Sequence, residues 1–313
     1  RAYHRLSGDA HVHATKAPRI GGPSSLATSG ASRRVARKPM QIIDPHTHVW
    51  LNDPQFPWPA ENTSPPAEDR PAETLLELMS AHGVERTVLV QVIHYRWDNS
   101  YVADCVRRFP DKFMGVGRVN PEDPAAADHV SEWTEKGIHG VRLSPAVGAA
   151  GDWFVDAAKM DPIFARAESL QVPLLLLTQP PRLSDLIPLL DRHPNLDVVI
   201  DHMADCKPDD MEGRRLLTDL ARYPRVTVKI SHTWSISDQA YPWSDTHGLV
   251  EDVYQAFGGP RIMWGTDWPV SQGKAEYGQT LSVVQDEFSR FIAAEDMEWV
   301  LGKTALSLWS FGQ

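Results

Sequence analysis

The first clear strand pattern in the chain is QIIDPHTHV, residues 41–49. Seven more short runs rich in β-branched and apolar residues follow it, separated by turns and helical segments. Several of these runs are almost continuously apolar, as is typical of parallel strands that are covered on both faces. The complete set of candidate strands is 41–49, 86–93, 113–119, 138–143, 173–178, 197–202, 226–231 and 262–267.

The segments between these strands carry apolar residues at helical spacing. The first, 71–82, has Pro71 in its first turn and stops at Gly83, which readily adopts a positive φ. The others are 161–170, 182–193, 210–222 and 280–294. Eight strand–helix repeats in about 270 residues match a (β/α)₈ TIM barrel, so we predict an α/β fold of this kind, distorted, over residues 41–313. The alternative is an open doubly wound sheet, but no strand is followed by a glycine-rich phosphate-binding motif.

Composition indicates a globular chain with an acidic body. Of its 313 residues, 42% are hydrophobic and 23% are charged, and no apolar run is long enough to cross a membrane. Residues 1–40 hold eight of the 31 basic residues and one of the 41 acidic ones, which leaves 23 basic and 40 acidic residues in 41–313. A body this acidic repels nucleic-acid phosphate, so we expect neither a nucleic-acid nor a membrane partner.

Residues 1–40 differ from the rest of the chain. They are rich in Ser, Ala, Gly and Arg and show neither helical nor strand periodicity, which predicts a disordered extension. The stretch lacks the apolar core of a secretory signal, and its Arg-rich, acid-poor composition fits either an organelle transit peptide or a solvated tail. The expected location is the cytoplasm, or an organelle in the first case, and not the cell exterior.

The candidate catalytic residues lie at strand ends, because a TIM barrel carries its active site at the C-terminal ends of its strands. The first strand ends in His46-Thr47-His48, whose two imidazoles point to the same face. The sixth strand ends in His202 and the eighth in Asp267. Two neutral imidazoles suit a divalent ion such as zinc, and Asp267 can ligate the ion and accept a proton from a water.

Each of these residues also has a structural explanation when it is taken alone. A His-x-His pair arises by chance, His202 can be a hydrogen-bonded core residue, and Asp267 can cap a helix. A functional site is favoured because all of them fall at the same end of their strands. Titratable groups that converge on one barrel face are typical of an active site.

Further residues at the same strand ends are candidates for substrate binding. Arg118 and Arg142 suit a substrate carboxylate, since a guanidinium binds it through two parallel hydrogen bonds, although a structural role is equally open. Trp268 and the long loop 50–70, rich in Pro and Trp, suit a flat ring. The full set is Gln91, His94, Arg118, Arg142, Lys229 and Trp268, with Ser231 and His232 just beyond Lys229.

Five stretches together resemble the amidohydrolase superfamily. They are IIDPHTHVW (42–50), DNSYVADCVRRFPDKFMGVGRVNP (98–121), LIPLLDRHPNLDVVIDHMA (186–204), RIMWGTDWPV (261–270) and LGKTALSLW (301–309). More narrowly, they resemble its amidohydrolase-related branch, which contains sugar lactonases, pyrone-dicarboxylate and sulfomuconolactone hydrolases, and ring-acid decarboxylases. The resemblance covers residues 41–311 and implies a TIM barrel. It also implies that His46 and His48 are the first-strand metal pair, His202 the sixth-strand histidine and Asp267 the catalytic aspartate.

The chain departs from that pattern on the fifth strand. Many metal-dependent members have a histidine ligand there, whereas this sequence reads Leu177-Thr178-Gln179-Pro180, and an amide is a poor zinc ligand. The resemblance thus implies a divalent metal, with zinc favoured over manganese, and leaves metal-independent activity open.

We therefore predict a hydrolase that opens a lactone, or a similar cyclic ester, carrying an anionic group. Asp267 would be the general base for an attacking water, and His202 would polarise the carbonyl. The alternative activity is metal-dependent decarboxylation of an aromatic or muconate-type acid, and a third interpretation is an inactive barrel that acts as a binding protein. The expected partner is a small-molecule substrate, and a homo-oligomer is compatible with the sequence.

Overall fold

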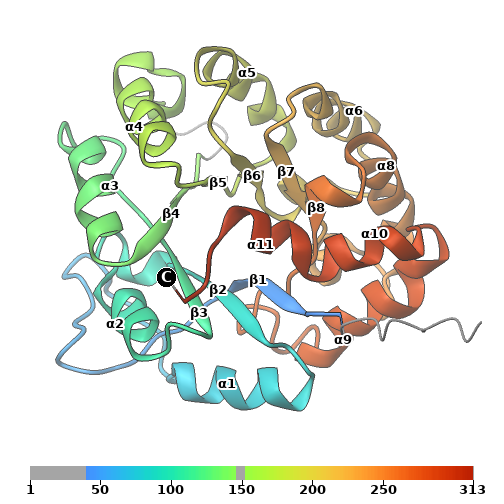
Figure 1. Ribbon diagram of the computed structural model, residues 1–313, viewed down its shortest axis with the longest axis horizontal. Helices are drawn as coiled ribbons and strands as arrows, with labels where there is room; N and C mark the ends of the chain where they lie inside the picture. Colours follow the sequence, from blue (N-terminus) through green and yellow to red (C-terminus); the bar gives the residue numbers. More distant parts are fainter. Residues whose placement is uncertain (1–39, 146–151, 313) are drawn as a thin grey trace, which may run out of the picture. The chain divides into compact units, whose positions relative to one another are not determined.

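Eight parallel strands form one sheet in which each strand pairs with its neighbours in chain order (Figure 1). The strands are β1 Ile43–Thr47, β2 Arg86–Val90, β3 Phe113–Gly117, β4 Ile138–Leu143, β5 Leu174–Leu176, β6 Val198–Ile200, β7 Val226–Lys229 and β8 Ile262–Met263. All eight predicted strands are confirmed, and all but β4 are shorter than the sequence pattern indicated. The TIM barrel is therefore confirmed as the fold.

The computed structural model describes residues 40–145 and 152–312. The predicted disordered extension, except for Met40, lies outside the described residues. No helix in the described ranges is long and apolar enough to cross a membrane.

Helices surround the sheet in the ring that Figure 1 shows. They are α1 Ala72–Ala81, α2 Ser100–Arg108, α3 Ala126–Glu135, α4 Ala157–Leu170, α5 Leu183–Arg192, α6 Met211–Asp219, α7 Thr233–Ile236, α8 His247–Phe257, α9 Tyr277–Ser282, α10 Ala294–Glu298 and α11 Thr304–Leu308. As predicted, α1 follows Pro71 and ends before Gly83, whose φ is +69°. The single helix predicted for 280–294 is wrong, because α9 gives way to a π-helical turn at Val283–Glu287 and a 3₁₀ turn at Phe288–Arg290.

Backbone hydrogen bonds beyond the last strand close the barrel. Asp267 N donates to His46 O at 2.9 Å, and His48 N donates to Trp268 O at 2.7 Å. Thr47 and Trp268 form a parallel bridge between the same two segments. Barrel closure therefore joins the strand ends that carry His46, His48 and Asp267.

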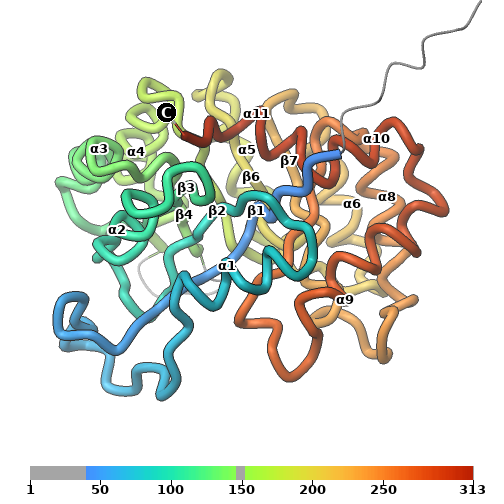
Figure 2. Tube along the Cα trace, turned by 60° about the horizontal axis from the view of Figure 1, so that its bottom comes forward, coloured from blue at the N-terminus to red at the C-terminus, as the bar shows by residue number. Residues whose placement is uncertain are grey.

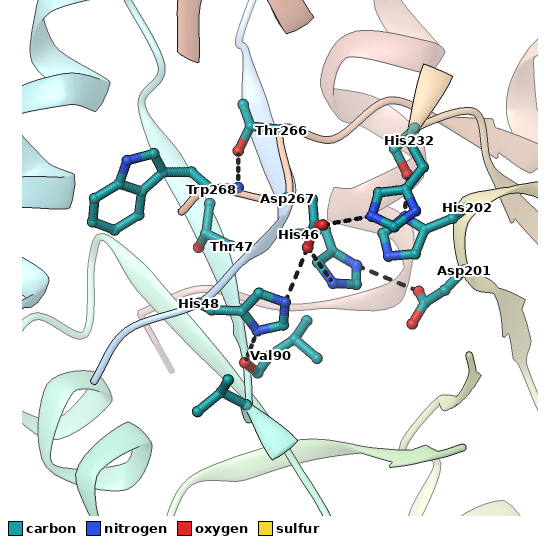
Figure 3. Close-up of polar contacts among 12 residues, drawn as sticks. His46, Thr47, His48, Val90, Asp201, His202, His232, Thr266, Asp267 and Trp268 are labelled. Atoms are coloured by element: carbon teal, nitrogen blue, oxygen red, sulfur yellow. Dashed lines mark hydrogen bonds and ion pairs between the residues drawn. The ribbon is translucent and has the colours of Figure 1, made fainter. Parts of the chain in front are cut away.

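An irregularity in β1 turns two histidines toward the barrel axis. The pairing of β1 with β2 shifts register between Asp44 and Thr47, and such a bulge interrupts the strict alternation of side chains along a strand. Ile43 packs with the apolar residues inside the barrel, whereas His46 and His48 lie with Asp267 at the C-terminal end (Figure 3). The bulge thus lets one short strand supply both the core and the site.

The N-terminal end of the barrel is filled by apolar side chains and covered by α11. Ala305 of α11 and the following Trp309 pack against the interior residues of the strands, Ile43 and Met263 among them. Trp309 Nε1 donates to His139 O at 2.9 Å. Figure 2 shows α11 at the opposite end of the barrel from the blue loop 50–70. This end is a packed core, so chemistry is restricted to the other end.

Gly302 tests how tightly the C-terminal segment packs on the start of β1. A Cβ at this position would lie 2.3 Å from the backbone oxygen of Gln41, so Gly302→Ala should lower the free energy of unfolding by about 1–3 kcal/mol. The control is Gly248→Ala in α8, where a Cβ would lie 3.6 Å from Arg214 Nη2 and alanine should be neutral or stabilising by up to ~1 kcal/mol. Urea denaturation measures both, and equal effects would contradict this account of the packing.

Candidate active site

Three buried donor groups converge at the C-terminal end of the barrel. Ligand atoms of His46, His202 and Asp267 all lie within 4.8 Å of one another. These residues come from β1 and from the segments directly after β6 and β8, and Figure 3 shows their side chains pointing toward one another. Two imidazoles and a carboxylate at this spacing form a group that can hold a divalent metal ion.

His48, the other half of the predicted first-strand pair, lies differently. Its Nδ1 lies 2.6 Å from Val90 O and donates to it, and its Nε2 lies 3.0 Å from Asp267 Oδ1. His48 therefore contacts Asp267 but does not belong to the closely spaced donor set.

The protonation states of the two imidazoles in the set suit a metal ion. Burial, together with the nearby charge of Lys229, lowers the pKa of His46 to about 3. Burial likewise holds the pKa of His202 well below its usual range. Both rings are therefore neutral near pH 7, the form in which one ring nitrogen keeps a lone pair. His46 Nε2 is buried and has no hydrogen-bond partner among the described residues, which fits a nitrogen directed at an ion.

Asp267 is a buried carboxylate held by two histidines. His232 Nε2 donates to its Oδ2 at 2.6 Å, and His48 Nε2 lies 3.0 Å from its Oδ1. Although burial opposes the charged form, the bonds from His232 and His48 hold the pKa of Asp267 well below its usual range. The group is therefore ionised at neutral pH and able to accept a proton or ligate an ion.

His232 contacts the site although from the sequence it was named only as a residue just beyond Lys229 and given no role. Its Nδ1 lies 2.8 Å from Asp205 Oδ1, and its ring stacks on His202 with centroids 3.8 Å apart. The available signal was its position just after the seventh strand, the rule that had selected His202 and Asp267. Asp205 carried no such signal, because it lies three residues beyond the expected end of the sixth strand.

The backbone bends sharply where three strands end. His202, His232 and Asp267 all have positive φ, at 55°, 67° and 55°. Left-handed backbone is unfavourable for residues with a Cβ and concentrates at functional sites. The side chains of these three residues lie together at the site (Figure 3).

A buried charge cluster lies beside His46. Asp201 Oδ1 lies 2.9 Å from Lys229 Nζ, and Asp201 Oδ2 accepts from Arg142 Nε at 2.9 Å. Lys229 Nζ also lies 2.9 Å from His46 Nδ1. Despite burial, the charges of Lys229 and Arg142 hold the pKa of Asp201 well below its usual range. The cluster thus fixes the His46 ring from the side opposite Asp267.

The predicted substrate-binding residues occupy different environments. Lys229 is fully buried within the cluster just described. Gln91 is also fully buried, and its amide donates to Asp98 O at 2.5 Å and accepts from Val92 N at 2.9 Å. It therefore holds the segment that follows β2.

His94 is half-buried and lies near two aromatic rings of loop 50–70. Its ring centroid is 6.2 Å from that of Trp50 and 6.4 Å from that of Trp58. Trp58 in turn stacks on Tyr95 with centroids 4.2 Å apart. Trp268 is buried at the barrel closure, and its indole nitrogen has no partner among the described residues.

Asp44 supports the strand ends from outside the barrel. It accepts hydrogen bonds from His46 N at 3.1 Å, Thr266 Oγ1 at 2.6 Å and Tyr277 OH at 3.2 Å. Burial raises the pKa of this carboxyl to about 6, against the effect of these bonds. Asp44 therefore ties β1 to the Thr266-Asp267 segment beside the site.

The buried cluster predicts a large cost for Asp201→Asn. The change leaves Lys229 and Arg142 without their acidic partner in the interior, so the free energy of unfolding should fall by about 3–5 kcal/mol. Asp197→Asn makes the same chemical change in an exposed pair with Arg225, whose atoms are 3.0 Å apart, and should cost less than ~1 kcal/mol. Similar losses in urea denaturation of the two variants would disprove the proposed role of the cluster.

Comparisons with known proteins agree with this geometry. The family model described as Amidohydrolase matches residues 43–311. The L-fucono-1,5-lactonase of Burkholderia ambifaria is 29% identical over 276 residues, which cover 84% of this chain and 93% of the relative. The 4-sulfomuconolactone hydrolase of Hydrogenophaga intermedia is 28% identical, and the match covers 73% of this chain and 74% of the relative.

A solved structure has the same fold. The zinc-bound amidohydrolase from Burkholderia multivorans superposes with a TM-score of 0.72 at 24% sequence identity, over 87% of this chain and 99% of that chain. The family match covers most of the chain and confirms the resemblance predicted from the sequence. The chain belongs to the amidohydrolase family.

Proposed function

We propose that this chain is a hydrolase that opens a lactone, or a similar cyclic ester, bearing an anionic group. The observation that carries the proposal is the convergence of the buried donor atoms of His46, His202 and Asp267 at the barrel mouth. The two relatives described above are a lactonase and a lactone hydrolase, which supports this reaction class.

The donor set fits a divalent metal ion, for which we propose zinc, with manganese as the alternative. His46, His202 and Asp267 would hold the ion, so His202 takes the place that the sequence assigned to His48. When bound, such an ion lowers the pKa of a water ligand from 15.7 toward ~7. His46 Nε2, which has no hydrogen-bond partner among the described residues and lies 3.5 Å from Asp267 Oδ1, supports this assignment.

Asp267 is proposed as the general base. Its carboxylate accepts a proton from a water as the water oxygen attacks the lactone carbonyl carbon. The ring C–O bond then breaks, and the same proton passes to the leaving oxygen, which yields the ring-opened hydroxy acid. His202 Nε2 can either hold an ion or donate a hydrogen bond to the carbonyl oxygen. If His202 holds the ion, it cannot also polarise the carbonyl through the same nitrogen. The polarising role predicted for His202 therefore applies only if the enzyme works without a metal.

The environment of Arg118 supports the proposal that the substrate is anionic, because its buried charge lacks an acidic partner among the described residues. Among the described residues its guanidinium bonds only Ser144 Oγ, at 2.9 Å, and its Nε has no partner. Trp97 lies against the guanidinium, with the ring centroid 5.5 Å from Cζ. Burial, together with the charge of nearby Arg142, lowers the pKa of Arg118 to about 9. An unpaired buried charge is unfavourable, and a bound carboxylate would relieve this.

The other buried arginines differ from Arg118 in this respect. Arg142 contacts Asp201 at 2.9 Å, and Arg182 contacts Asp152 at 2.5 Å. We therefore assign the substrate anion to Arg118 first, with the remaining nitrogens of Arg142 as a second contact. Of the other candidates, His94 lies beside Trp50 and Trp58, and Trp268 is buried at the barrel closure. Gln91 and Lys229 position the groups that they contact.

A panel of lactones and carboxylated aromatic acids tests the proposal, assayed with a chelator and with added Zn²⁺ or Mn²⁺. Ring opening without CO₂ is expected, and Asp267→Asn should lower turnover by ~10²–10⁴-fold, because the amide keeps the shape but cannot accept the proton. Release of CO₂ would instead indicate a decarboxylase. If no compound is turned over, the result would indicate an inactive barrel that acts as a binding protein. Full activity after chelation would remove the metal from the proposal.

The role of Arg118 is tested by comparing a carboxylated lactone with its neutral methyl ester. The wild type should prefer the acid, and Arg118→Met should reduce that preference by about 10- to 100-fold, since a hydrogen bond to a charged group contributes ~1.5–3 kcal/mol. Arg142→Met serves as the comparison and should change the preference less. A preference retained in both variants would show that the anion is held elsewhere.

A further inference from the structure

His232 is held on three sides by groups of the site. Its Nε2 donates to Asp267 Oδ2 at 2.6 Å and its Nδ1 donates to Asp205 Oδ1 at 2.8 Å. One face of its ring stacks on His202 with an interplanar angle of 12°, and the edge-on ring of Trp234 lies 4.6 Å away. Figure 3 shows His232 beside His202 and its dashed contact to Asp267. The ring is therefore fixed in both position and orientation.

The backbone after β6 is shaped to hold this ring. His202, Met203, Ala204 and Asp205 have φ values of 55°, 53°, 56° and 48°, so four consecutive residues form a left-handed turn. Such a turn is unfavourable for residues with a Cβ. It brings His202 and Asp205, three positions apart, against the same imidazole, one by stacking and the other by a hydrogen bond. The contacts with His232 compensate for the backbone conformation.

We propose that Asp205 and His232 are positioning residues, which hold the Asp267 carboxylate and the His202 ring in the arrangement that the proposed function requires. The inference rests on that function for its kinetic consequence but not for its effect on metal binding. His232 occupies Oδ2 of Asp267, so Oδ1 is the oxygen that faces His46 Nε2, at 3.5 Å, and it also contacts His48 Nε2, at 3.0 Å. Asp267 therefore presents one defined oxygen to the ion or to the attacking water.

Geometry rules out a freely turning ring at His232. Both ring nitrogens face carboxylate oxygens, so rotating the ring breaks both hydrogen bonds at once. Burial opposes the charged form, yet the bonds to Asp205 and Asp267 raise the pKa of His232 to about 9. Residues that hydrogen-bond to metal-ligating groups fix the orientation of those groups, and their loss lowers activity or metal affinity by ~10- to 100-fold.

Asp205→Ala and Asp205→Asn test the proposal, because Asp205 contacts His232 without contacting the donor set itself. Asp161→Ala is the matched control. His193 also has both nitrogens near carboxylates, with Nε2 3.2 Å from Asp161 Oδ1 and Nδ1 3.7 Å from Glu168 Oε2. Asp161 belongs to α4 and has no part in the proposed reaction.

Two measurements are made on each variant. The first is kcat and KM on a lactone that the wild type opens, and the second is the affinity of the metal-stripped full chain for Zn²⁺ alone. Asp205→Ala should lower kcat and zinc affinity by ~10- to 100-fold with KM nearly unchanged. Asp205→Asn should restore most of both, because its amide oxygen still accepts the Nδ1–H of His232. Asp161→Ala should match the wild type.

The outcomes separate this inference from the proposed function. If the wild type opens no lactone but Asp205→Ala still weakens zinc binding relative to Asp161→Ala, the function fails and the positioning role stands. If Asp205→Ala folds and matches Asp161→Ala in both measurements, the positioning role is wrong. If Asp205→Ala does not fold, Asp205→Asn and His232→Gln are compared instead, and normal kcat and zinc affinity in His232→Gln would overturn the inference.

Discussion

The backbone hydrogen bonds between His46–His48 and Asp267–Trp268 close the barrel, and the geometry of the candidate site depends on them. They set the separation between the end of β1 and the residues after β8, and so the distances from the two histidines to Asp267. Asp44 strengthens the same junction by binding the backbone of His46 and the hydroxyl of Thr266. The same contacts therefore close the fold and assemble the site.

Polarity divides the barrel along its axis. The N-terminal half is filled by apolar residues under α11, whereas the C-terminal half holds Asp201, Lys229 and Arg142 away from water. Burying three charges is unfavourable unless they satisfy one another, and here a single carboxylate contacts both cations. The cluster holds His46 in place. The unfavourable desolvation of these three charges therefore occurs next to a residue of the candidate site.

The sequence predicted the strands well because parallel strands buried on both faces leave long apolar runs, and it predicted His46, His202 and Asp267 because they follow such runs directly. It did not predict the break after α9, since apolar spacing does not distinguish a continuous helix from one interrupted by a π-helical turn. The left-handed turn after β6 had no sequence signature, because Met203 and Ala204 seldom adopt positive φ. Asp205 was missed because it lies at the end of that turn, three residues beyond the expected end of the sixth strand.

The apolar filling of the barrel determines where small molecules enter and leave the site. Because α11 and Trp309 close the N-terminal end over a packed interior, the described residues leave no passage through the barrel between its two ends. A compound that reaches the site and the compound formed from it share the entrance at the C-terminal end. Ring-opened product retains the anionic group that we assign to Arg118, so it occupies the position that the next molecule needs. On the proposed function, accumulated product would therefore compete with the substrate for Arg118.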